Sequence, residues 1–134
     1  IHYTSTGFPR LKQYLDEMDG IPLQNYWLDI PPINSQAFER LAYPTQKPEA
    51  LLERILKNTS NDGDLVADFF CGSGTTMLAA QRTGRVVRAT EIAPEYVDVT
   101  IKRFQQNFSE VPVTLVATGQ TFDAVATERL GAPA

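Results

Sequence analysis

A short glycine-rich segment, residues 68–76, constrains the fold of this chain more than any other feature. It reads DFFCGSGTT and lies between an apolar segment, residues 65–67, and a run of helix-forming residues. A strand, a glycine-rich turn and a helix in this order bring a small anionic or zwitterionic ligand against free N–H groups at the helix N-terminus. Gly72 and Gly74 allow a sharp turn and a close approach of the backbone to the ligand. We therefore expect a nucleotide-like cofactor at this turn.

The spacing around the turn limits which cofactor it can take. A dinucleotide fingerprint would need a third glycine where the chain has Met77, and a phosphate-binding P-loop would need a lysine that the turn lacks. Asp68 would repel a pyrophosphate but would accept a hydrogen bond from an ammonium group. A second apolar strand, residues 86–90, leads to Glu91, about 20 residues past the first glycine, where an acidic residue takes both hydroxyls of a ribose. A ligand with a ribose, a cationic amine and no phosphate fits S-adenosylmethionine.

Three segments, in order, resemble a known family. Residues 68–76 resemble the D-P-F-x-G-S/C-G-T-T cofactor motif of the DNA amino-methyltransferases, which modify adenine N6 or cytosine N4. Residues 43–52, YPTQKPEALL, are similar to the Y-P-T-Q-K-P-x-x-L-L segment that precedes this motif in the permuted, beta-class arrangement, and residues 90–96 resemble the ribose-binding G-I-E/D-I-x-P-E-Y stretch. Residues 11–42 also resemble the segment before T-Q-K-P in some of these enzymes. Phe69 stands where the family usually has proline, which we expect to change loop stiffness without abolishing binding.

The resemblance implies an α/β protein with the Rossmann-like fold of S-adenosylmethionine-dependent methyltransferases, in which a partial parallel sheet carries helices on its faces. The order strand, helix, strand, helix, strand agrees, because it favours right-handed crossovers in a parallel sheet. We expect two parts. Residues 1–44 form a loop-rich N-terminal segment, a remnant of an upstream catalytic part that faces the target, and residues 45–134 form the cofactor-binding α/β subdomain.

Apolar spacing, glycines and prolines predict the individual elements. Strands are expected at 65–67, 86–90 and 113–116, an extended segment at 27–30, and helices at 10–18, 48–58, 77–82 and 94–108. The first strand is apolar throughout, which predicts a short buried strand. Residues 121–130 are compatible with a helix or with a frayed tail.

The resemblance and the turn together suggest a set of binding residues. The predicted cofactor-binding residues are Thr45, Lys47, Asp68, Phe70, Gly72, Ser73, Gly74, Thr75, Glu91 and Ile92. Asp68 would bind the amino group of the cofactor or cap the following loop, and Glu91 would hold the ribose hydroxyls. Phe70 would pack against the ligand or serve as an ordinary core aromatic. Thr45 and Lys47 would close the pocket from the other side, as the resemblance implies, although Lys47 is also compatible with a surface charge.

The glycines of the turn have an expected role of their own. Gly72 and Gly74 would clear space for the methionine part of the cofactor, while the amides of Thr75 and Thr76 would meet its carboxylate. On this interpretation a valine at position 74 would fill the pocket and abolish binding while the chain stays folded.

The chain lacks a recognisable catalytic motif. The family grips its flipped target base with a D/N/S-P-P-Y/F/W tetrapeptide, and the only candidate is residues 29–33, DIPPI. Ile30 separates the carboxylate from the prolines, and no aromatic residue follows them. We therefore predict no catalytic residue here and expect the chain to bind cofactor but to transfer nothing alone. Because the family pattern extends well upstream of Ile1, a fragment of a larger enzyme is expected.

Composition limits the other possibilities. A chain of 134 residues with 43% hydrophobic residues can bury a core as one globular domain. Its single cysteine, Cys71, excludes an internal disulfide and fits a reducing cytoplasm, and with only one histidine no zinc site is expected. No apolar run reaches the length of a membrane span.

The basic residues give no support for DNA binding by this chain, whose net charge is −4. Those that cluster in the sequence are Arg82, Arg85, Arg88, Lys102 and Arg103, and we interpret them as solvated charges at helix ends and strand edges. Double-stranded DNA would then be bound through the full-length enzyme. A homodimer is compatible with the sequence.

The expected function is the S-adenosylmethionine-binding part of a bacterial-type, restriction-modification-like DNA methyltransferase. Adenine N6 and cytosine N4 both remain open as targets. One alternative is a methyltransferase for a small molecule, RNA or protein, but it does not explain T-Q-K-P before the turn. Another is a non-catalytic scaffold or dimerisation module, which the missing tetrapeptide keeps open.

Overall fold

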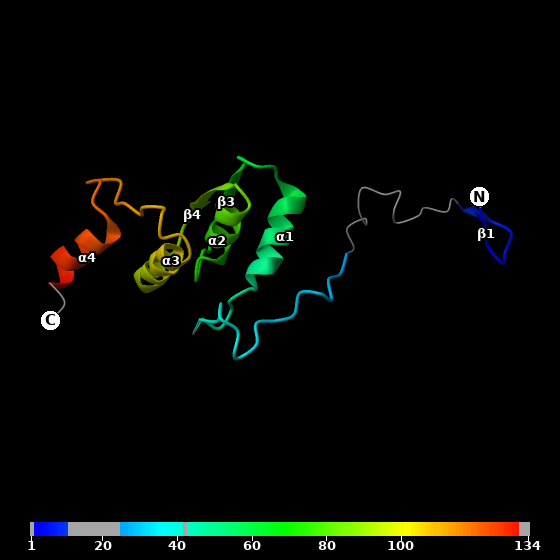
Figure 1. Ribbon diagram of the computed structural model, residues 1–134, viewed down its shortest axis with the longest axis horizontal. Helices are drawn as coiled ribbons and strands as arrows, with labels where there is room; N and C mark the ends of the chain where they lie inside the picture. Colours follow the sequence, from blue (N-terminus) through cyan, green and yellow to red (C-terminus); the bar gives the residue numbers. More distant parts are fainter. Residues whose placement is uncertain (1, 11–24, 42, 132–134) are drawn as a thin grey trace.

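The computed structural model describes residues 2–10, 25–41 and 43–131 (Figure 1). The predicted helix at 10–18 lies almost entirely outside the described residues. In chain order the elements are β1 (His2–Tyr3), β2 (Pro9–Arg10), α1 (Glu49–Thr59), β3 (Leu65–Asp68), α2 (Thr75–Arg82), β4 (Val86–Ala89), α3 (Pro94–Asn107) and α4 (Phe122–Leu130). In Figure 1 the elements from α1 to α3 form the central group, and α4 lies at its C-terminal side.

The centre of the fold is a parallel pair of strands. β3 pairs with β4 in a register that sets Leu65 opposite Val86 and Asp68 opposite Ala89. α2 makes the crossover between them, so the carboxyl ends of both strands lie at the same edge. The segments that follow the two strands remain hydrogen-bonded beyond the last residue pair of the ladder, because the N–H of Cys71 donates to the carbonyl of Thr90 at 3.0 Å. The turn after β3 and the segment after β4 are thereby neighbours.

One face of this pair is covered by helices. The buried side chains Leu56 of α1 and Ala79 and Ala80 of α2 form the core, and Val66 and Val87 pack against it from the two strands. The alanines let α1 and α2 approach each other and the sheet closely, since they add little bulk between the elements. α1 begins after Pro48 as expected from a proline at a helix start, and α3 packs against α2 with Phe104 buried.

The opposite face differs from the prediction of a buried strand. Leu65 is 66% exposed and Val86 is 45% exposed, because no element in the described part of the chain covers the side chains that alternate to that face. Apart from this exposure, the α/β fold class is confirmed: a small parallel sheet carries helices.

The predicted third strand at 113–116 is wrong. Its residues make only an isolated antiparallel bridge between Thr114 and Thr121. The chain reverses directly after it, since the N–H of Gly119 donates to the carbonyl of Leu115 at 2.7 Å with Gly119 at φ 74°. Such a reversal leaves Val116 98% exposed. Residues 121–130, for which a helix and a frayed tail were both compatible with the sequence, form α4 and its N-cap. The Thr121 side chain caps this helix by accepting a hydrogen bond from the Ala124 N–H.

The N-terminal segment contains little regular structure where it is described. β1 and β2 form a two-residue antiparallel ladder, and residues 27–30 form bends and no strand. This fits a loop-rich segment, although the boundary at residue 44 stays a prediction. Among the described residues no helix is long and apolar enough to cross a membrane.

Candidate cofactor-binding site

The glycine turn is buried and fixed by its own backbone. Residues 71–75 are all buried, and the N–H of Gly74 donates to the carbonyl of Cys71 at 3.0 Å. Gly72 has a φ of 55° and Gly74 a φ of 80°, both in the left-handed region that favours glycine. Burial also raises the pKa of the Cys71 thiol, so the sulfur stays protonated within the turn.

Close packing by the protein itself explains both glycines. A Cβ at Gly72 would lie 2.7 Å from the Oη atom of Tyr43, and a Cβ at Gly74 would lie 2.6 Å from Cγ2 of Thr100. The space beside each glycine is therefore filled by a side chain of the protein. Packing within the protein is therefore a second reason for glycine at both positions, beside the predicted role of clearing space for the cofactor. At position 74 a larger side chain would meet Thr100, so we expect a valine there to strain the fold as well.

A cavity of about 310 Å³ lies beside the turn. Seven of the ten predicted binding residues line it: Thr45, Lys47, Asp68, Phe70, Gly72, Ser73 and Thr75. Gly74 does not line this cavity, and the side chain of Ile92 is 97% exposed. Glu91 lines a second cavity of about 230 Å³, which shares Cys71 with the first.

Glu91 reaches the turn directly. Its Oε2 atom accepts a hydrogen bond from the Gly72 N–H at 2.7 Å, and its Oε1 atom accepts one from the Ala93 N–H at 3.0 Å. The Ala93 and Gly72 amides lower the pKa of Glu91, so the carboxylate is charged at neutral pH. An ionised carboxylate has about four acceptor positions, so further donors can bind at this edge of the sheet.

Asp68 and Phe70 line the first cavity, of about 310 Å³. The Oδ1 atom of Asp68 accepts a hydrogen bond from the Phe70 N–H at 3.0 Å, which is the loop-capping role. Its Oδ2 atom makes no hydrogen bond within the described part of the chain. The Phe70 side chain is 90% exposed, so the alternative of an ordinary core aromatic is wrong.

The N-terminus of α2 presents free donors to the cavity. Its N-cap residue, Gly74, offers no side-chain cap, and among the described residues no acceptor meets the backbone N–H of Ser73, Thr75 or Thr76. Unpaired N–H groups and the helix dipole together favour an anionic group at this position.

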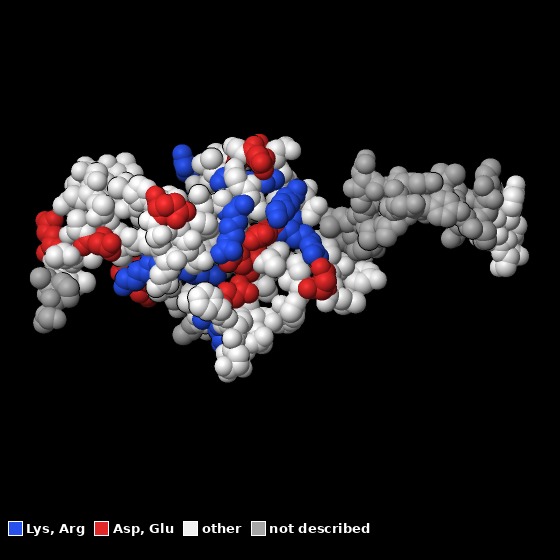
Figure 2. Space-filling model, in the orientation of Figure 1, with Lys and Arg blue, Asp and Glu red and all other residues white. Residues whose placement is uncertain are grey.

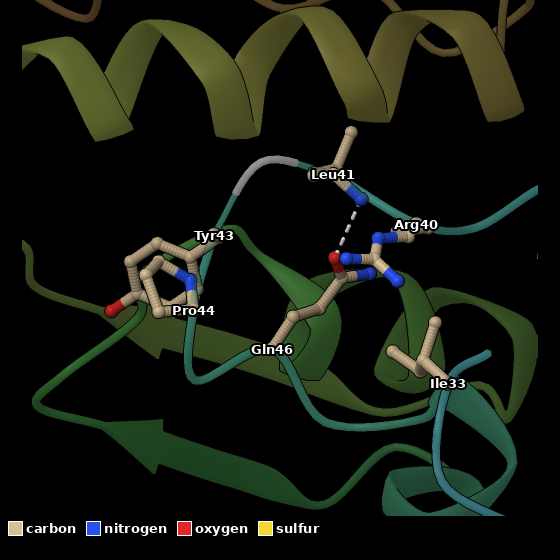
Figure 3. A pocket seen from close by; sticks show the side chains of 6 residues that line it. All are labelled: Ile33, Arg40, Leu41, Tyr43, Pro44 and Gln46. Carbon is tan, nitrogen blue, oxygen red and sulfur yellow. Dashed lines mark hydrogen bonds between the residues drawn. The ribbon is translucent and has the colours of Figure 1, made fainter. Parts of the chain in front are cut away.

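The opposite wall of the cavity comes from residues 43–47. Gln46 holds this wall in place, because its Oε1 atom accepts from the Leu41 N–H at 2.8 Å (Figure 3). Its Nε2 atom also donates to the Glu39 carbonyl at 2.5 Å. Lys47 donates from Nζ to the Thr45 carbonyl at 2.9 Å. A neighbouring cavity of about 330 Å³ is lined by Ile33, Arg40, Leu41, Tyr43, Pro44 and Gln46.

Sequence reasoning missed three residues of the site. The ring of Tyr43 covers Gly72 and packs edge-on against Tyr96, with 4.8 Å between ring centroids. Thr100 and Arg103 of α3 are 5% and 6% exposed and donate hydrogen bonds to the turn. The sequence feature that could have indicated this pair is the spacing of three residues between Thr100 and Arg103, which places both on one face of the predicted helix.

The prediction of solvated charges is wrong for Arg103 and for Arg85, whose side chain is only 7% exposed, while Arg82 is partly exposed but paired. Arg82 forms an ion pair with Glu49, with 2.6 Å between Nε and Oε1, and Arg85 pairs with Asp62 at 2.7 Å. In Figure 2 basic side chains lie among acidic ones over the central body. The visible face thus carries no continuous basic patch.

Asp29, of the rejected tetrapeptide, is held by α1. Both of its carboxylate oxygens accept from the Arg54 guanidinium, at 2.9 and 2.5 Å. This hydrogen bonding lowers the pKa of Asp29 from 3.8 to about 2. The geometry gives Asp29 a role in attaching residues 25–41 to α1. No group of three His, Cys, Asp or Glu side chains in the described ranges is arranged to hold a metal ion.

Parallel strands, a glycine turn at a helix N-terminus and a carboxylate after the next strand define the class: an α/β protein with the Rossmann-like methyltransferase fold. The particular family follows from comparison with known proteins. The model of the N6/N4 DNA methylase family matches residues 5–102. This chain belongs to that family.

Individual relatives agree with this assignment. The chain is 41% identical over 80 residues to the type II methyltransferase M.EcaI of Enterobacter cloacae, which covers 60% of the chain and 18% of that protein. It is 44% identical over 79 residues to the DNA adenine methyltransferase YhdJ of Escherichia coli K12, which covers 59% of the chain and 26% of YhdJ. The chain thus spans only about a quarter or less of these relatives.

Two solved structures are similar to slightly less than half of this chain. A complex of M1.HpyAVI with S-adenosylmethionine (SAM) is 42% identical, covering 48% of this chain and 32% of that one, with a TM-score of 0.48. The DNA modification methylase TTHA0409 of Thermus thermophilus, complexed with S-adenosyl-L-methionine, is 40% identical, covering 45% and 25%, with a TM-score of 0.44.

Proposed function

We propose that this chain is the S-adenosylmethionine-binding part of a DNA methyltransferase that methylates an exocyclic amino group, adenine N6 or cytosine N4. One observation carries the proposal: the Glu91 carboxylate lies 2.7 Å from the backbone N–H of Gly72. A ribose-binding carboxylate and a turn with free amides thus meet at one sheet edge, as a nucleoside with an amino-acid tail requires.

Each part of the ligand has a complementary group. Glu91 accepts hydrogen bonds from the ribose hydroxyls with the acceptor positions that its two backbone contacts leave open. The unpaired amides at the start of α2 bind the methionine carboxylate, and Asp68 binds the ammonium group with its Oδ2 atom. Phe70 and Ile92, both largely exposed, offer apolar surface to the adenine. Thr45 and Lys47 close the cavity from the other wall.

The bound cofactor would supply an electrophilic methyl group on a sulfonium. The exocyclic amine of the target base is a poor nucleophile, so its orientation must come from groups that grip the flipped base. The described part of this chain offers no D-P-P-Y-type tetrapeptide for that purpose, and Asp29 is paired with Arg54. DNA binding and methyl transfer are therefore proposed for the full-length protein, with this chain holding the methyl donor.

Calorimetric titration with S-adenosylmethionine tests the proposal in the full-length natural protein that contains this chain. We expect one binding site with micromolar affinity and a rise in melting temperature. Absence of both heat and thermal shift at saturating ligand would refute it. Transfer of labelled methyl groups to unmethylated DNA, followed by nucleoside analysis, then separates adenine N6 from cytosine N4.

The scaffold alternative has a different outcome in the same assays. The missing tetrapeptide favours it, and it predicts a folded protein that binds no cofactor. A methyltransferase for a small molecule, RNA or protein would bind cofactor but leave DNA unlabelled.

A further inference from the structure

Two buried polar residues of α3, Thr100 and Arg103, hold the glycine turn by its carbonyl groups. The Oγ1 atom of Thr100 donates to the Gly72 carbonyl at 3.1 Å. The Nη1 atom of Arg103 donates to the Ser73 carbonyl at 3.1 Å and lies 3.0 Å from Oγ1 of Thr75. Burying a charged arginine costs free energy because the guanidinium loses its hydration, unless hydrogen bonds and opposite charges compensate for that loss. We call this pair the α3 clamp.

The clamp fixes the direction of an amide that the cofactor needs. The carbonyl of Gly72 and the N–H of Ser73 belong to one planar trans peptide, so they point in opposite directions. With that carbonyl drawn to Thr100, the Ser73 N–H points away from α3. The cavity lined by Gly72 and Ser73 has no α3 residue in its wall, whereas Thr100 lines the second cavity with Glu91. Within the described residues this N–H has no protein acceptor.

A counter-charge from α1 compensates the buried guanidinium. Burial lowers the pKa of Arg103, while Glu49 and Glu39 oppose that change by their negative charge. Glu49 is itself partly buried and is paired with Arg82. Glu39 caps α1, because its Oε2 atom accepts from the Glu49 N–H at 2.9 Å. Charged residues of α1, α2 and the segment 25–41 therefore surround Arg103. Its Nη2 atom has no hydrogen-bond partner among the described residues.

We propose that Thr100 and Arg103 are positioning residues that hold the glycine turn with the Ser73 amide directed at the methionine end of the cofactor. This inference rests on the proposed function, since it assumes that the cofactor lies against the turn. Its specific content is that the clamp controls affinity for the amino-acid part of the ligand more strongly than affinity for the nucleoside part.

Binding of two ligands by matched variants tests this in the full-length natural protein. The ligands are S-adenosylmethionine and 5′-methylthioadenosine, which shares the nucleoside but has no amino-acid group. Thr100→Val keeps the shape of the side chain and removes the donor, so we expect its Kd for S-adenosylmethionine to rise about three- to tenfold. Its Kd for 5′-methylthioadenosine should change clearly less, because Thr100 also lines the cavity beside Glu91 but valine keeps the shape of that wall. Thr100→Ser keeps the hydroxyl and should restore wild-type affinity.

Arg103→Lys is the second variant, with Lys102→Met as the control because Lys102 is exposed on the same helix. A lysine cannot reach both acceptors as the planar guanidinium does, so the same selective loss is expected, while the control should bind both ligands normally. If Arg103→Lys fails to fold, Thr100→Val decides alone.

The outcomes are distinct. Wild-type protein that does not bind S-adenosylmethionine would refute the proposed function and the clamp with it. Wild-type binding with an unchanged Thr100→Val variant would refute the clamp only. Equal losses for both ligands would also overturn it, because they would mean that α3 supports the whole fold and not the direction of the turn.

Discussion

Replacing Gly74 with alanine should destabilise the folded chain for two separable reasons. The first is the backbone: Gly74 has a φ of 80°, and a left-handed conformation is about 1–2 kcal/mol less favourable for a residue with a Cβ. The second is packing, since the new Cβ would lie 2.6 Å from Cγ2 and 2.9 Å from Oγ1 of Thr100. Overpacking in a buried position is unfavourable by about 1–3 kcal/mol. Together they predict a loss of about 2–5 kcal/mol in the free energy of unfolding.

Gly63 provides a matched control. It has a φ of 83°, but an added Cβ would meet nothing within 4 Å. The change in unfolding free energy of Gly63→Ala therefore contains two contributions, the backbone penalty and the lower entropy of the unfolded chain. Both contributions should be the same at position 74. Denaturant unfolding of both variants, followed by circular dichroism, gives the packing contribution as their difference.

A double-mutant cycle identifies the partner in that contact. Thr100→Ala removes both atoms that lie closest and leaves only Cβ, at 3.1 Å from the added atom. We expect Gly74→Ala to be less destabilising in the Thr100→Ala background by about 1 kcal/mol or more. If Gly74→Ala destabilises no more than Gly63→Ala, or if the cycle shows no coupling, the packing explanation for the glycine is wrong.

Two further predictions concern carboxylates. Glu91→Gln should weaken S-adenosylmethionine binding about ten- to hundredfold by calorimetry, because the acceptor of the ribose hydroxyls loses its charge; Asp98→Asn, on the exposed face of α3, is the control and should bind normally. Asp29 should titrate at about 2 in NMR and return toward 3.8 in Arg54→Met. Because the folded pKa is the lower one, the contribution of this pair to stability should be lost as the pH falls from about 4 to 2; an Asp29 pKa unaffected by Arg54→Met would contradict the pairing.

The central part of the fold could be predicted because its signals are local. An apolar strand, a glycine pair and a helix-forming run follow each other between residues 65 and 82, and the structure contains β3, the turn and α2 there. Pro94 at a helix start and the apolar spacing after it predicted α3. The closeness of Glu91 to the turn followed from topology alone, since carboxyl ends of parallel strands share one edge.

The segment 113–116 shows where such signals fail. Four residues of mixed apolar character are compatible with a strand, but strand formation requires a partner with free backbone groups. Here the chain reverses at Gly119 and bonds to itself, with 2.8 Å between the Leu115 N–H and the Gln120 carbonyl. A short apolar run does not show whether its partner is the sheet or the next turn.

Arg103 was missed for a different reason. An arginine on a helix is exposed by default, and nothing in its immediate neighbours indicates burial. The requirement came from a distant place: once residues 71–75 are buried, the carbonyls of Gly72 and Ser73 need donors that water no longer provides. Helix α3 supplies both donors, three residues apart. A buried turn thus implies hydrogen-bond donors on the element that packs against it. Here that element is α3, so the burial of the turn requires polar residues on the inner face of this helix.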